Sequence, residues 1–103
     1  MTMDVYLVII EGDSGTRDAN ISVFDNYDAA VEYIESCVSG QKYIEGENNL
    51  TVKYIDCEKE SVFIDGWMMC GNPLYYVEVW NAFGGRQYVT KRFIIRKEVN
   101  NGF

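Results

Sequence analysis

The apolar residues of this chain recur with a helical period in one segment, and that segment constrains the fold more than any other sequence feature. Between residues 27 and 38 they recur at the spacing of one face of a helix. They are Tyr27, Ala30, Val31, Ile34 and Val38. Asp25 or Asn26 can cap the first turn, and Gly40 stands where a left-handed C-cap is common. The spacing therefore predicts one helix of about 13 residues.

The segments around this helix have the alternating or continuously apolar pattern of strands. We expect strands at residues 4–11, 21–25, 50–56, 61–65, 74–81 and 86–99. Residues 41–49 contain Gly46 and an Asn-Asn pair, which predicts a loop. The order β-β-α-β-β-β-β predicts a single α+β domain, with an antiparallel sheet of about five to six strands and one helix packed on a face.

Length and composition predict one globular domain in the cytoplasm. The chain has 103 residues, of which 48% are hydrophobic, and this is enough to build a core. The longest purely apolar run covers residues 5–10, whereas a membrane helix needs about 20 such residues. No charged and then apolar signal segment precedes it, so we expect neither secretion nor a membrane partner.

The residue types present exclude several kinds of chemistry. The chain contains no histidine, which removes the common general base and the catalytic triads that depend on it. The sequence GDSG at residues 12–15 is like a serine-protease nucleophile loop, but Ser14 has no base to activate it. Cys37, Cys57 and Cys70 are widely spaced and form no CxxC pair, which is typical of reduced thiols. We therefore expect a non-enzymatic protein without cofactor or metal.

Charge is distributed unevenly along the chain, whose net charge is −7. Residues 1–40 hold eight acidic residues and one basic residue, whereas residues 74–103 hold two acidic residues and five basic ones. This asymmetry predicts a dipolar molecule. The acidic balance also argues against direct nucleic-acid binding, because it repels phosphates.

An acidic row on the predicted helix is the first candidate contact surface. Asp28, Glu32 and Glu35 follow at i, i+4 and i+7, opposite the predicted core positions. Successive carboxylates then step by roughly 6 and 4.5 Å along the helix axis, which is comparable to phosphate spacing in nucleic acids. Together with Asp13 and Asp18 in the neighbouring connector, they could contact a protein partner. The alternative is an ordinary solvated helix face.

The basic C-terminal hairpin is the second candidate surface. We expect Trp80, Arg86, Lys91, Arg92 and Arg96 to contribute to it. Arg92 and Arg96 fall on one strand face, where they could meet an acidic patch on a partner or on a second copy of the chain. The alternative is that the basic residues protect the edge of a sheet against aggregation.

The segment VYLVIIEGDSG…ISVFDNYDAAVEYIES, followed later by VEVW, resembles small proteins of bacteria and their phages. Compact acidic proteins without enzymatic residues are also similar in character to phage-encoded inhibitors of host defence, including anti-CRISPR proteins. The resemblance implies an inhibitor that acts in the host cytoplasm and occupies a basic nucleic-acid-binding surface of a host protein. Two other hypotheses remain open: a small-ligand-binding or enzymatic domain, and a homodimer formed through the C-terminal hairpin.

Overall fold

The computed structural model describes residues 2–12, 20–59, 73–83 and 86–100, and confirms the α+β class. Its strands are β1 (Thr2–Gly12), β2 (Asn20–Phe24), β3 (Leu50–Ile55), β4 (Tyr75–Phe83) and β5 (Arg86–Asn100). Helix α1 (Tyr27–Glu45) and the short 3-10 turn η1 (Glu47–Asn49) connect β2 to β3. The strand predicted at 61–65 lies outside the described residues.

All strand pairs are antiparallel, in the order β2-β1-β5-β4-β3. Strand β5 pairs with β1 from Thr2↔Asn100 to Gly12↔Thr90 and with β4 on its other side. The basic strand is therefore at the centre of the sheet, and the hypothesis that its lysines protect a sheet edge is wrong. Among the described strands, the edges are β2 and β3.

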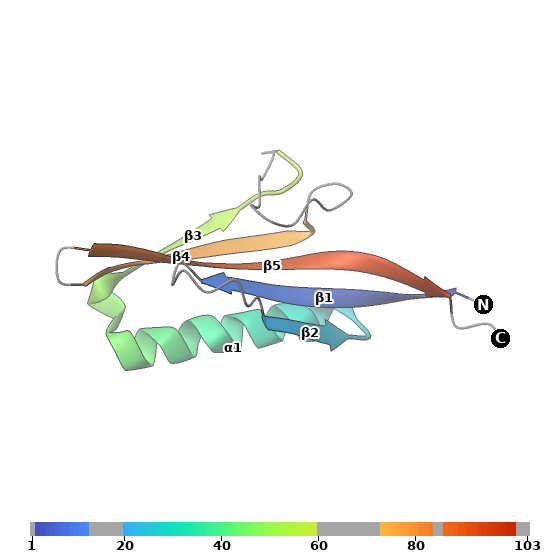
Figure 1. Cartoon of the computed structure of the whole chain (residues 1–103), viewed down its shortest axis with the longest axis horizontal. Coiled ribbons are helices and arrows are strands. Elements are labelled where there is room, and N and C mark those ends of the chain that lie inside the picture. Colours follow the sequence, from blue (N-terminus) through green and yellow to red (C-terminus); the bar gives the residue numbers. More distant parts are fainter. Residues whose placement is uncertain (1, 13–19, 60–72, 84–85, 101–103) are drawn as a thin grey trace.

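Two hydrophobic clusters stabilise the sheet, one on each face. Helix α1 covers one face (Figure 1), and the cluster between them contains Val8, Ala30, Ile34, Val38, Val77, Val79 and Ile94. The cluster on the opposite face contains Ile9, Cys57, Tyr76, Phe93 and Ile95. Because side chains alternate along a strand, the neighbouring residues Phe93 and Ile94 pack in different clusters on opposite faces of the sheet. We call the face that carries the second cluster the open face, because no described helix covers it.

Helix α1 begins as predicted but ends later. The side chain of Asn26 caps its first turn by accepting a hydrogen bond from the backbone N–H of Ala29 at 2.8 Å. The predicted end at Gly40 is wrong, because the helix continues to Glu45 and its cap is Gly46, which has φ +88°. A glycine within a helix costs only about 1 kcal/mol, so one exposed glycine does not terminate it. No helix among the described residues is long and apolar enough to span a membrane.

The two glycines are expected to respond oppositely to alanine substitution. A methyl group at Gly40 would meet no atom within 4 Å, so Gly40→Ala should stabilise the fold by about 0.5–1 kcal/mol. Gly46→Ala should destabilise it by about 1–2 kcal/mol, because alanine is strained at positive φ. Urea unfolding monitored by circular dichroism measures both changes. A destabilising Gly40→Ala would contradict the helix end placed at Glu45.

Candidate functional site

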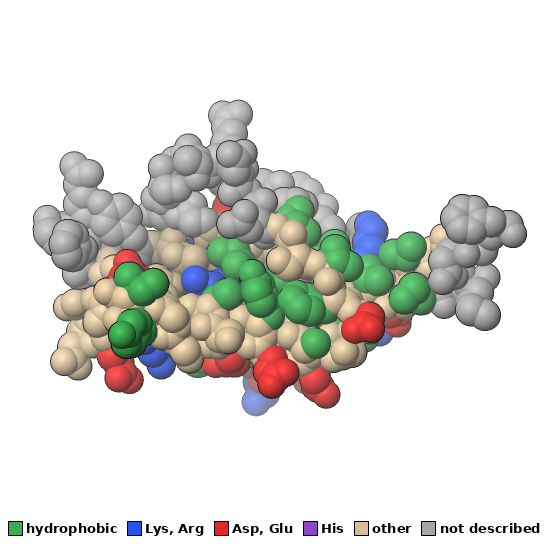
Figure 2. All heavy atoms as spheres, turned by 90° about the horizontal axis from the view of Figure 1, so that it is seen from below, with side chains coloured by type: hydrophobic (Ala, Val, Ile, Leu, Met, Phe, Trp, Pro, Cys, Tyr) green, Lys and Arg blue, Asp and Glu red, His purple; other side chains and the backbone are tan. Residues whose placement is uncertain are grey.

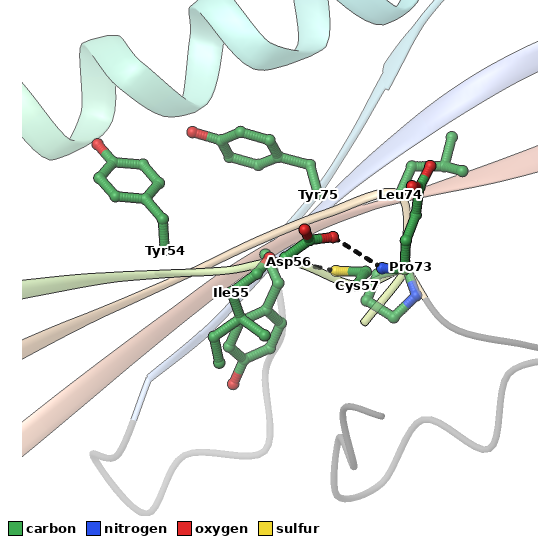
Figure 3. A pocket seen from close by; sticks show the side chains of 9 residues that line it. Tyr54, Ile55, Asp56, Cys57, Pro73, Leu74 and Tyr75 are labelled. Atoms are coloured by element: carbon green, nitrogen blue, oxygen red, sulfur yellow. Dashed lines mark hydrogen bonds between the residues drawn. The ribbon is translucent and has the colours of Figure 1, made fainter. Parts of the chain in front are cut away.

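A cleft of about 330 Å³ lies where β3 ends and β4 begins (Figure 3). Its walls combine aromatic, aliphatic and acidic side chains from the two strands and the short segments beside them. The lining residues are Tyr54, Ile55, Asp56, Cys57, Glu58, Pro73, Leu74, Tyr75 and Tyr76. The antiparallel pairing of β3 with β4 brings these two segments of the chain together.

Tyr54 and Tyr75 form an aromatic wall that is held by one carboxylate. Their ring centroids are 6.2 Å apart in an edge-to-face arrangement. The hydroxyl of Tyr54 donates to Glu35 Oε2 at 3.1 Å, and the hydroxyl of Tyr75 donates to Glu35 Oε1. Both hydroxyls point towards the helix (Figure 3). A single helix residue thus fixes both rings, and the cleft is partly organised before any ligand arrives.

The electrostatics of these groups favour binding over nucleophilic chemistry. Burial, with the neighbouring Glu35 carboxylate, raises the pKa of both Tyr54 and Tyr75, so their hydroxyls remain protonated donors at neutral pH. Burial and the charge of Asp56 also raise the pKa of the Cys57 thiol. A thiol with a raised pKa is a weak nucleophile, because the thiolate is the reactive form.

The rim of the cleft is acidic. Asp56 and Glu58 are both exposed, and Asp56 Oδ1 accepts a hydrogen bond from the backbone N–H of Glu58 at 3.1 Å. Lys59 Nζ lies 3.7 Å from Asp56 Oδ2, but this pair is exposed to solvent and contributes little. The described part of the chain contains no group of three or more residues suited to holding a metal ion. An aromatic wall beside carboxylates suits an organic cation with an apolar stem.

The three residues of the predicted acidic row differ in their exposure to solvent. Asp28 and Glu32 are exposed on α1, as expected of contact residues. Glu35 does not share their solvent-facing position, and that part of the prediction is wrong. It lies at the border of the buried helix face, where its side chain reaches the two tyrosine hydroxyls on β3 and β4. Asp13 and Asp18 lie outside the described residues.

The residues of the predicted basic surface also differ in their exposure to solvent. Arg92 and Arg96 share the helix-side face of β5, but α1 covers Arg92, which is only 8% exposed, while Arg96 is exposed. Burial lowers the pKa of Arg92, and the nearby Cys37 and Glu45 oppose this effect. The two arginines share a face as predicted, but burial leaves little of Arg92 accessible to an acidic patch.

Two other residues of the predicted basic surface, Lys91 and Trp80, lie on the opposite face of the sheet from Arg92. Lys91 lies on the open face, because it alternates with Arg92 along β5. Trp80 shares this face, and its indole N–H donates to Glu78 Oε2 at 2.9 Å. The backbone of Arg86 begins β5, and its side chain is outside the described part. The expected set of basic contact residues therefore does not form one surface.

Sequence reasoning missed the cleft. The sequence patterns singled out neither Tyr54 nor Glu58 as a contact residue. The available signal was a tyrosine near the end of one predicted strand, with acidic residues after it, and a tyrosine pair near the start of another. That signal becomes a site only when the two strand ends are paired.

Comparisons with protein-family models, with curated proteins and with solved structures found no match to this chain. The resemblance to small phage and bacterial proteins therefore stays a prediction. The fold and the cleft are the observations from which a function can be proposed.

Proposed function

We propose that the protein is a non-enzymatic binding protein that holds a basic side chain of a protein partner in this cleft. The observation that carries the proposal is the wall formed by Tyr54 and Tyr75, fixed by Glu35 and bordered by carboxylates. An arginine or lysine could lay its aliphatic stem against the tyrosines and direct its charge to Asp56 or Glu58. A cation over an exposed aromatic ring contributes about 0.5–1 kcal/mol, and the carboxylates add to this.

The acidic helix surface supports the same kind of partner. Asp28 and Glu32 are exposed, and acidic side chains gather along one border of the helix-side surface (Figure 2). With a net charge of −7, the protein attracts basic surfaces and increases the rate of encounter with them. Basic nucleic-acid-binding proteins provide such surfaces. An inhibitor that covers the nucleic-acid site of a host protein is the function we infer.

Titration with short peptides tests the cleft directly, by NMR or calorimetry. A peptide with a central arginine should bind at least about tenfold more tightly than the same peptide with citrulline, which keeps the shape but lacks the charge. Tyr54→Ala and Glu58→Lys should each weaken arginine-peptide binding by about tenfold. Glu98→Lys is the matched control, because Glu98 is exposed on β5 away from the cleft, and it should leave binding unchanged.

The outcomes separate the competing functions. Equal affinity for the arginine and citrulline peptides, or equal loss of binding in Glu58→Lys and Glu98→Lys, would contradict the proposed cation site. Repeating the titration at higher salt should weaken binding, since exposed charges are screened. A large thermal stabilisation by one class of neutral metabolite, without any arginine preference, would instead support the small-ligand hypothesis.

A further inference from the structure

Strand β2 is an edge strand with an unusually apolar exposed side. Among the described strands its one neighbour is β1, so no described strand pairs with the backbone groups of its outer edge. Its residues Asn20–Phe24 include no charged residue and no proline. Ile21 is 48% exposed and Val23 is 62% exposed. Exposed apolar edge strands readily pair with another strand.

The opposite edge of the sheet differs. Strand β3 carries Lys53, which is exposed on the open face. A lysine on an edge strand hinders edge-to-edge pairing, because pairing would bury or crowd its charge. Lys53 disfavours pairing at β3 in this way, whereas β2 has no such residue. The contrast singles out β2 as the edge available for pairing.

Apolar side chains continue from β2 onto the open face, where that of Ile9 is buried. The register places Val23 opposite Leu7 and Ile21 opposite Ile9, whose side chains pack in or against the open-face cluster. Further along the same face the register pairs Met3 with Val99, and both are exposed. Apolar side chains therefore continue from the β2 edge onto β1 and β5.

Charge does not oppose the approach of a second copy at this face. The charged strand residues described on the open face are Glu11, Lys53, Glu78, Lys91 and Lys97. They nearly balance, whereas Asp28 and Glu32 are exposed on the helix that covers the other face. Pairing along β2 joins the sheets edge to edge, so it does not bring the faces that carry these residues into contact.

We propose that β2 pairs antiparallel with β2 of a second copy of this chain, joining two five-stranded sheets into one. The residues on either side of Ser22, Ile21 and Val23, are both β-branched and aliphatic. A twofold axis there places Ile21 opposite Val23 of the partner subunit, and the reverse pair follows by symmetry. Such cross-strand aliphatic pairs stabilise antiparallel sheets.

Light scattering after size exclusion tests this pairing. The chain of 11.9 kDa should elute as a dimer at concentrations of about 100 μM, and Val23→Lys should weaken dimerisation at least about tenfold. Thr51→Lys is the matched control, because Thr51 is exposed on the other edge strand, and it should leave the dimer intact. Circular dichroism verifies that both variants are folded. A monomeric wild-type chain, or equal dimerisation of both variants, overturns the proposal.

A crosslink tests the register. Residues directly opposite in an antiparallel pair have Cα atoms about 4.5–5.5 Å apart, which suits a disulfide. Ser22→Cys should therefore give a covalent dimer on mild oxidation, above the background of the wild-type cysteines. Thr51→Cys should not exceed that background. A dimer in solution without the Ser22→Cys crosslink would place the interface elsewhere, for example at the C-terminal hairpin.

Discussion

Arg92→Glu is expected to destabilise the fold by at least about 3 kcal/mol, because it places an uncompensated negative charge under α1. Arg92 is almost completely buried, and its Nε and Nη1 atoms have no hydrogen-bond partner in the described part of the chain. Glu45, whose side chain accepts a hydrogen bond from Asn81 Nδ2 at 2.6 Å, is among the charges that act on Arg92. A glutamate at position 92 would add a second carboxylate there. Urea unfolding measures the loss.

Two further variants separate burial from charge. Arg96→Glu makes the same charge change at an exposed position of β5 and should alter stability by no more than about 0.5 kcal/mol. Arg92→Met removes the charge and the unsatisfied nitrogen atoms but keeps most of the volume, so it should be neutral or stabilising by about 1 kcal/mol. If Arg92→Glu were as mild as Arg96→Glu, Arg92 would not lie beneath the helix.

Phe93→Ala is expected to cost about 3–5 kcal/mol, the range for removing a fully buried aromatic side chain. Phe93 has no exposed area, although it lies on the sheet face away from α1. Its ring stacks with that of Tyr76 at a centroid distance of 6.3 Å. The cost therefore measures whether the open face carries a genuine second core. Chemical denaturation with circular dichroism again provides the measurement.

Val99→Ala is the control on the same strand and the same face. Val99 is 39% exposed, so its truncation should cost less than about 1 kcal/mol. Ile94→Ala, on the helix side of β5, should cost about 2–5 kcal/mol. It gives the corresponding cost for the cluster between α1 and the sheet. A Phe93→Ala cost as small as that of Val99→Ala would mean that the open face lacks a packed cluster.

Local patterns in the sequence were sufficient to predict most secondary structure. The helical period and the capping residue located the start of α1, because both act within one turn of chain. The alternating segments gave five strands whose limits agree with the structure to within two residues. The end of α1 was missed, because a glycine at position 40 is a weak stop signal and only the positive φ of Gly46 marks the cap.

The candidate site was less predictable, because it depends on which distant segments meet. Glu35 contacts tyrosines 19 and 40 positions further along the chain. The helical projection placed Glu35 with the solvent-facing residues and did not predict its proximity to β3 and β4. The same limit explains why Tyr54 and Glu58 were not recognised as parts of one cleft.

The sequence by itself determined the kinds of element, the α+β class and the uneven distribution of charge, since periodicity, capping and composition are properties of short segments. Tertiary structure alone decided that β5 is central, because its pairing with β1 joins residues from opposite ends of the chain. That pairing places Arg92 under α1, leaves β2 and β3 as the edges of the described sheet, and contributes to the cleft beside Tyr54 and Tyr75. The physical reason is that burial and edge position depend on strand order, which the pattern of a single strand does not encode.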